Sequence, residues 1–227
     1  MPASVLAALP SQGAVIARLR DQIGTLEGRR SERLCPAPAA LTPLLPDGGW
    51  KPGCAYGVGS VELLAALLAV PSREGSWCAV VGLPEQGVEA AALAGVNLDR
   101  LVLVPKPGQR WLSVVASLGG ALPVVAVRPL ERVREADAAR LAARLREHQT
   151  VLFALGGWPG AEATVTLDDV DWAGLGDGWG HLTGRQASLS VTSKRWPGAR
   201  SVRISLPEGQ VVEPLEEAAD ELWQVAV

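Results

Sequence analysis

The segment from Tyr56 to Leu64 reads Tyr-Gly-Val-Gly-Ser-Val-Glu-Leu-Leu and lies where a phosphate-binding loop would join a first strand to a first helix. Such a loop needs a second glycine, then lysine, then serine or threonine, because backbone amides and the lysine hold phosphates while the hydroxyl holds magnesium. Counted from Gly57, these places hold Glu62, Leu63 and Leu64. A loop shortened by one residue puts Glu62 at the lysine and Leu63 at the hydroxyl.

We therefore expect a degenerate phosphate loop whose carboxylate repels phosphate, and a chain that uses no nucleotide cofactor and is not an enzyme. The residues of this degenerate loop are Gly57, Gly59, Ser60 and Glu62. Lys51 and Lys106 lie outside the loop, although an arginine from elsewhere in the fold could in principle supply the missing charge.

A stretch of positive charge is the second candidate site. Between Gly178 and Pro207 the chain carries five lysine or arginine residues, with Trp196 among them, and no acidic residue. The residues of this candidate nucleic-acid site are Arg185, Lys194, Arg195, Trp196, Arg200 and Arg203. Basic groups can follow a phosphate backbone while an aromatic ring stacks on a base, which predicts weak binding of single-stranded DNA. The alternative is a solvated sheet edge that its charges protect from pairing with other strands.

Metal and nucleophile chemistry have little support in the residue spacing. Asp169, Asp171 and Asp177 suggest a calcium loop, but its fifth and twelfth positions hold Ala173 and Gly180, which cannot act as side-chain ligands. A solvated acidic turn is the better interpretation.

Histidines and cysteines are few and scattered. His148 and His181 share no nucleophile motif, and Cys35, Cys54 and Cys78 form no pair with metal-ligand or redox spacing. We therefore expect no metal site and reduced thiols.

The apolar pattern predicts the elements that position these residues. Short apolar runs alternate with helical stretches, which favours right-handed crossovers and a largely parallel sheet. The expected strands are 53–57, 77–82, 101–104, 122–127 and 150–155, separated by helices 60–70, 87–95, 109–117 and 134–147. Strand-like stretches 186–192 and 200–206 predict an antiparallel extension of the sheet.

The organisation expected along the chain has three parts: residues 1–46 with an amphipathic helix and a linker, a core over 47–207, and an acidic tail over 208–227. The helix, 13–27, carries an apolar stripe that needs a partner. The residues of this stripe are Val15, Ile16, Leu19, Ile23 and Leu26. The interval 28–46 is rich in arginine, proline and alanine without periodicity, which indicates a linker or an irregular wrap.

Net charge and apolar patterning bear on which partners the chain can bind and on where in the cell it is expected. A net charge of −3 over 227 residues gives no general attraction to nucleic acid or to anionic membranes, so such contacts need a local patch. No segment reaches the apolar length that spans a bilayer, and the first residues do not read as an export signal, so we expect a cytoplasmic protein with no membrane partner.

From about Leu41 to Leu206 the sequence resembles the RecA family of recombinases and, more closely, the actinobacterial form of the ImuA family of RecA-like accessory proteins. The most specific match is the segment 89–104, Glu-Ala-Ala-Ala-Leu-Ala-Gly-Val-Asn-Leu-Asp-Arg-Leu-Val-Leu-Val, which resembles a RecA helix, turn and third strand. The turn at Tyr56 and Gly57 also matches in place. The resemblance implies an α/β fold with a RecA-like three-layer core, a mostly parallel central sheet, an antiparallel extension and an N-terminal helix.

The resemblance also implies departures from an ATPase. The catalytic glutamate of RecA falls at Pro84, with Glu85 one place late, and the magnesium-associated aspartate falls at Arg128. Together with the altered phosphate loop, three elements of the ATP site are missing, which indicates a scaffold.

By the same resemblance the partner would be an ImuB-type inactive Y-family polymerase homologue, with a DnaE-type error-prone polymerase and RecA as further candidates, in SOS-induced translesion synthesis. In RecA a helix ahead of the core packs on the neighbouring subunit, so the stripe at 13–27 implies docking on a partner or self-association; the alternative is packing on its own core. The rival functions are a SulA-like cell-division inhibitor, a DNA- or RecA-binding modulator of recombination, and a true nucleotide-dependent enzyme.

Overall fold

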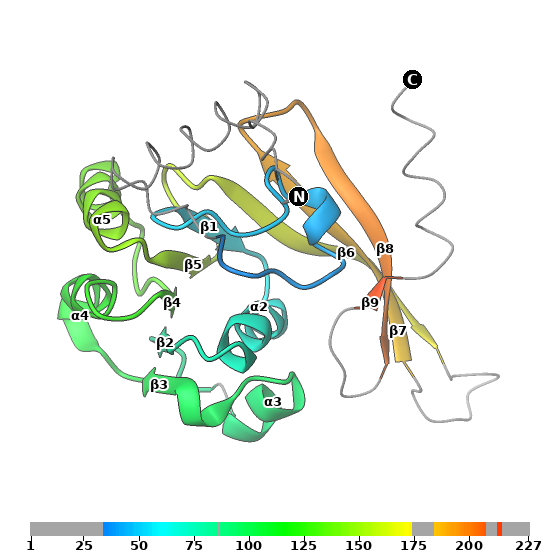
Figure 1. The fold of residues 1–227 in the computed structure, drawn as a ribbon, viewed down its shortest axis with the longest axis horizontal. Coiled ribbons are helices and arrows are strands. Elements are labelled where there is room, and N and C mark those ends of the chain that lie inside the picture. The colour runs from blue at the N-terminus through cyan, green and yellow to red at the C-terminus, as the bar shows by residue number, and fades with distance from the viewer. Residues whose placement is uncertain (1–33, 86, 174–183, 208–212, 215–227) are drawn as a thin grey trace, which may run out of the picture. The chain divides into compact units, whose positions relative to one another are not determined.

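The computed structural model describes residues 34–85, 87–173, 184–207 and 213–214. The helix predicted at 13–27, with its apolar stripe, lies outside these residues, as do Asp177, Gly180, His181 and most of the acidic tail. Within the described residues, a sheet of nine strands has the order β3-β2-β4-β5-β1-β6-β7-β8-β9 (Figure 1). Strands β3 to β6 in that order are parallel, and β7, β8 and β9 continue the sheet antiparallel.

The bounds of the elements follow the predicted order. The strands are β1 Ala55–Val58, β2 Cys78–Val81, β3 Leu101–Val104, β4 Val124–Val127, β5 Val151–Leu155, β6 Ala163–Ala173, β7 Gly184–Ser193, β8 Ala199–Pro207 and β9 Glu213–Pro214. The α-helices are α2 Val61–Arg73, α3 Val88–Leu93, α4 Trp111–Leu118 and α5 Glu135–His148, and the short 3-10 helices are η1 Thr42–Leu44, η2 Leu98–Arg100 and η3 Gly108–Arg110. The α/β fold with its antiparallel extension is thus confirmed.

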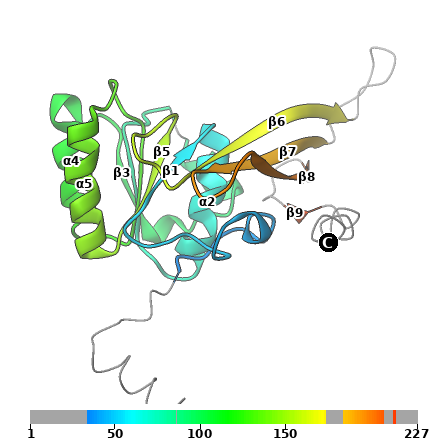
Figure 2. The ribbon, with the colours of Figure 1, turned by 90° about the horizontal axis from the view of Figure 1, so that it is seen from above.

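Two helical layers cover the parallel sheet (Figure 2). Side chains of α2 and α3 pack into the core on one face, which we call the α2 face, and side chains of α4 and α5 pack into a second core on the other face. Strands β2 and β4 are buried at every position, as continuous apolar runs between two helical layers require. The position expected for a phosphate loop lies at the turn between β1 and α2.

The segment ahead of β1 belongs to the core. Leu41, Leu44 and Trp50 are fully buried on the α2 face, and the Trp50 ring lies 4.8 Å from the Tyr56 ring and 5.0 Å from the Phe153 ring. The core therefore starts before residue 47. Of the two interpretations left open by the sequence, a linker or an irregular wrap, the described segment 34–46 fits the wrap, because its leucines Leu41, Leu44 and Leu45 are buried in the core.

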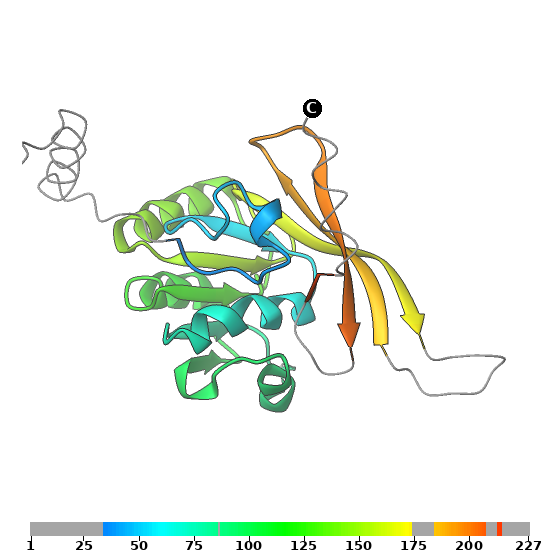
Figure 3. The same ribbon diagram turned by 45° about the vertical axis from the view of Figure 1, so that its right-hand side comes forward.

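Strand β6 is the one long element that the sequence pattern did not predict. It begins with alternating apolar residues at Ala163, Val165 and Leu167, but a register shift between Asp168 and Asp171 breaks that alternation. Figure 3 shows β6, β7 and β8 running side by side beyond the helical layers. Among the described residues, none of the helices combines the length and the apolarity needed to cross a membrane.

Candidate functional site

The turn between β1 and α2 is two residues long. It consists of Gly59 and Ser60, since β1 ends at Val58 and α2 begins at Val61. The Gly59 amide donates to the Val165 carbonyl at 2.9 Å, and the Leu63 amide donates to the Ser60 hydroxyl at 3.2 Å. Two amides at this position are thus already engaged within the protein.

Gly57 of β1 and Gly59 of the turn lie close to β6. A Cβ atom on Gly57 would lie 2.8 Å from Thr164 Oγ1 and 3.1 Å from the Gly156 carbonyl oxygen. A Cβ on Gly59 would lie 3.2 Å from Thr166 Cγ2. Glycine at both places is therefore explained by packing against a neighbouring strand.

An arginine from the extension meets Glu62. The Glu62 carboxylate, in the first turn of α2, forms an ion pair with Arg185 of β7. The Arg185 side chain is only 19% exposed, and its guanidinium lies 5.2 Å from the centre of the Trp172 ring. The charge that an arginine could have offered to phosphate is balanced here by the carboxylate.

Arg128, at the place of the magnesium-associated aspartate, meets Glu85, the residue after Pro84. Arg128 follows β4 and forms an ion pair with Glu85, which follows β2. The backbone amide of Arg128 donates to the Val81 carbonyl at 3.0 Å, so the ends of strands β4 and β2 are held side by side. This pairing gives Glu85 a structural partner of opposite charge.

The basic stretch does not form one surface. Arg185 pairs with Glu62 at one end of β7, and Arg203 of β8 pairs with Asp171 of β6. After the other end of β7, Arg195 pairs with Asp47 and Glu162. Most of its arginines are therefore neutralised by carboxylates of the same chain.

The remaining members lie around the β7–β8 turn. The Arg200 guanidinium stacks 4.1 Å from the centre of the Trp196 ring, and that ring packs against the core of the α2 face. Lys194 is exposed, and no carboxylate among the described residues forms an ion pair with it. Only Lys194 and Arg200 keep a positive charge without an acidic partner in this part of the chain.

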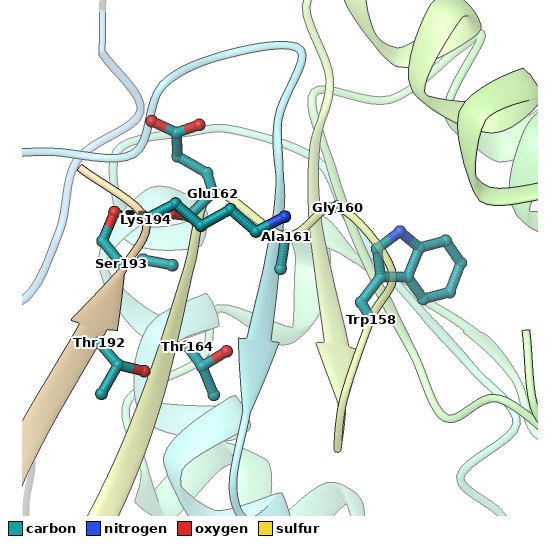
Figure 4. A pocket seen from close by; sticks show the side chains of 9 residues that line it. Trp158, Gly160, Ala161, Glu162, Thr164, Thr192, Ser193 and Lys194 are labelled. Atoms are coloured by element: carbon teal, nitrogen blue, oxygen red, sulfur yellow. Dashed lines mark hydrogen bonds between the residues drawn. The ribbon is translucent and has the colours of Figure 1, made fainter. Parts of the chain in front are cut away.

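An open cleft of about 300 Å³ lies beside Lys194, where β6 begins. In Figure 4 the Lys194 side chain extends across it toward Ala161, and Thr164 and Thr192 lie side by side below. Trp158 lies at the opposite side, and the Ser193 hydroxyl donates to the Glu162 carbonyl at 2.8 Å. The cleft offers one ammonium and several hydroxyls, without a nucleophile paired to a base.

Metal chemistry finds no support among the described residues, which contain no cluster of three or more possible ligands. Asp171 is held by Arg203, and Asp169 adopts a left-handed backbone with φ of 50°. Burial raises the pKa of the Cys35 and Cys78 thiols to about 12, so both are neutral at physiological pH.

Comparison with known proteins shows the family of this chain. Residues 43–160 match the family model described as the MT3502 N-terminal domain. The chain is also 32% identical over 175 residues to the uncharacterized protein Rv3395c of Mycobacterium tuberculosis, a match that covers 70% of this chain and 83% of that protein. The chain belongs to the MT3502 N-terminal domain family.

The part that matches the MT3502 N-terminal domain runs from η1 to the connection after β5. It contains Glu62, Glu85 and Arg128, whereas Arg185 and the rest of the extension lie outside it. The residue pattern does not single out Trp172, whose ring lies under Arg185; the apolar alternation at the start of β6 is the signal that could reveal its strand.

Proposed function

We propose that this chain is a non-catalytic, RecA-like accessory protein of the ImuA type that acts in SOS-induced, error-prone translesion DNA synthesis. Its work is protein–protein contact with an ImuB-type inactive Y-family polymerase homologue. A DnaE-type error-prone polymerase and RecA are further candidate partners.

The observation that carries the non-catalytic part of the proposal is the ion pair of Glu62 with Arg185 at the phosphate-loop position. An ATPase needs an unpaired cation there and free backbone amides around it. Here the carboxylate takes the place of the cation, and the Gly59 amide is bound to β6. These contacts support a scaffold whose nucleotide site is filled by its own side chains.

A surface suited to protein contact lies at the opposite end of the sheet. Strand β3 is the edge of the sheet within the described residues and carries four apolar residues without a charge or a proline. Leu103 of β3 is exposed, as are Leu98 of η2 and Val88 of α3, and Leu93 of α3 is 67% exposed. Exposed apolar residues beside an unprotected strand edge are typical of interaction sites.

The decisive experiment is co-purification of the tagged full chain from DNA-damaged cells of its own species. Recovery of an ImuB-type homologue, lost when Leu93 and Leu103 are changed to Asp, is the expected result. The matched control, Leu130→Asp, changes an exposed leucine on the connection after β4 and should retain the partner. Recovery of the cell-division GTPase instead would favour the SulA-like alternative, and recovery of RecA alone would favour a modulator of recombination.

The apolar stripe at 13–27 is a second candidate contact. Burying each large aliphatic side chain contributes about 1.5 to 3 kcal/mol, so the stripe needs a cover. Leu19→Asp with Ile23→Asp is expected to abolish partner binding or self-association while the Tm of the monomer stays nearly constant. A large fall in monomer Tm would show that these residues pack on their own core.

A further inference from the structure

We infer that the cleft where β6 begins is a binding site for a carboxylate attached to a small apolar group, on a free acid or at the C-terminus of a peptide. Lys194 is its cation, Thr164 and Thr192 are its hydrogen-bond donors, and Trp158 and Ala161 form its apolar side. This site involves neither β3 nor the partner proposed above, so its test is independent of the proposed function.

The two threonines of the cleft lie on the side of the sheet opposite to the α2 face. Ala163 and Val165 of β6 and Val191 of β7 are buried in the core of the α2 face, so alternation along the strands puts Thr164 and Thr192 on the other side. The second core, beneath α4 and α5, includes no described residue of β6, β7 or β8. The pair is therefore open to solvent, with Thr192 exposed and Thr164 half-buried.

Both threonine hydroxyls are available to a ligand. Among the described residues, neither hydroxyl has a hydrogen-bond partner. Thr164 and Thr192 are directly opposite each other on paired strands, a position in which Cβ atoms are about 4.5 to 5.5 Å apart. Two hydroxyls placed in this way can donate to the two oxygens of one carboxylate.

Lys194 supplies a positive charge from a backbone that is fixed on both sides. The Ser193 hydroxyl donates to the Glu162 carbonyl at 2.8 Å and accepts from the Arg195 amide at 3.2 Å. The Arg195 guanidinium is paired with the Glu162 carboxylate, which points away from the threonines in Figure 4. No carboxylate of the described residues pairs with Lys194, so the cleft keeps one unbalanced positive charge.

Charge and size favour a carboxylate among the oxyanions. One positive charge balances a carboxylate, whereas a phosphate monoester carries about 1.5 to 2 negative charges at pH 7 and would lie beside Glu162. A nucleic-acid strand needs cations along its path, but the same side of β6 continues to Asp168 and Asp171, and Arg203 is already paired with Asp171. The cleft volume of about 300 Å³ suits a small ligand, and Trp158, which is only 7% exposed, is a rigid wall for an apolar group.

The test is a fluorine NMR titration of the full chain with para-fluorophenylacetate and with the neutral para-fluorophenylacetamide. We expect the acid to bind and the amide to bind about tenfold more weakly or less, because the amide lacks the charge that Lys194 recognises. Lys194→Met should weaken binding of the acid about tenfold, and Thr192→Val about threefold.

Competition identifies the source of the carboxylate. Displacement of the fluorinated acid by acetyl-glycyl-phenylalanine at a lower concentration than by phenylacetate would identify a peptide C-terminus. The reverse order would identify a free acid.

The matched control for the charge is Lys106→Met. Lys106 is also an exposed lysine, on the connection after β3, and its loss should leave the affinity within about twofold. Ser201→Ala is the control for the hydroxyls, because Ser201 lies on the same side of the sheet but does not line the cleft. The inference is overturned if the acid does not bind at millimolar concentration, if the amide or dimethyl phosphate binds equally well, or if Lys194→Met leaves the affinity unchanged.

Discussion

At the scale of single residues, Glu62 determines what the β1–α2 turn can do. Its carboxylate stands at the second glycine of a phosphate loop or, in the register shortened by one residue, at the lysine, and it forms an ion pair with Arg185. The Glu62 side chain is about half exposed, so this pair stabilises the fold only modestly, on the order of 1 kcal/mol or less. Its main consequence is to fill the position with opposite charges.

Restoring a lysine at this position should not restore nucleotide binding. Glu62→Lys brings an ammonium toward the Arg185 guanidinium, so we expect a loss of about 1 kcal/mol of unfolding free energy and no heat of binding with magnesium and ATP in calorimetry. Glu62→Gln, which has similar size and no charge, is the control and should cost less. Micromolar ATP affinity in the unmodified chain or in the lysine variant would contradict the proposal.

At the scale of elements, the close approach of β6 explains why residue 57 of β1 is a glycine. Strand β6 approaches so closely that a side chain on Gly57 meets Thr164 and the Gly156 carbonyl. Gly57 is therefore explained by the packing of β1 against β6. From the sequence alone, the same glycine could equally be interpreted as part of a phosphate loop.

Gly57→Ala is expected to destabilise the chain by about 1 to 3 kcal/mol, because the new methyl group overpacks the β1–β6 contact. Gly157→Ala is the matched control, since a Cβ there meets nothing within 4 Å. Denaturant titration of both variants measures the difference. Equal free energies of unfolding for the two variants would show that β6 can move to make room for the methyl group without loss of stability.

The extension also sets the strength of any DNA binding. Five free basic groups would give a log–log salt slope of roughly 3.5 in magnitude, at about 0.7 for each phosphate neutralised. With Arg185, Arg195 and Arg203 paired, only Lys194 and Arg200 remain, so we expect a slope of about 1.4. Fluorescence anisotropy with single-stranded DNA measures it, and Lys194→Ala with Arg200→Ala should remove the binding. A slope near 3.5 would mean that the ion pairs open for DNA.

At the scale of the whole molecule, the cysteines report on the packing of the core. Burial raises the pKa of the Cys35 and Cys78 thiols to about 12, above the usual value of about 8.5. Between about pH 8.5 and pH 12, the two thiols thus keep their protons in the folded chain but lose them in the unfolded chain. Their contribution to stability is full below about pH 8.5 and is lost as the pH rises toward 12.

The free energy of unfolding should therefore be nearly constant from about pH 7 to 8 and fall between about pH 9 and 10, by up to about 1.4 kcal/mol per pH unit for each thiol. Urea titrations at each pH measure the slope. Cys78→Ala should flatten it while lowering the overall stability through the lost packing. An unchanged slope in that variant would show that other groups control the alkaline range.

Residue types and the apolar pattern were enough to predict the parallel core and the absence of the phosphate-binding lysine. Continuous apolar runs such as those of β2 and β4 can fold only between two covering layers, and an absent lysine is visible without coordinates. These features are local, so pattern and residue type suffice to predict them.

Which side chains contact one another could not be predicted from the pattern and became visible in the folded chain. The ion pair of Glu62 with Arg185 joins residues far apart in the chain, and β6 was hidden because its bulge interrupts the alternation that marks a strand. The basic stretch appears continuous in sequence, but alternation along β7 and β8 sends its members to different faces, where carboxylates of other elements neutralise them. Long-range pairing of this kind depends on strand register, which one-dimensional periodicity does not encode.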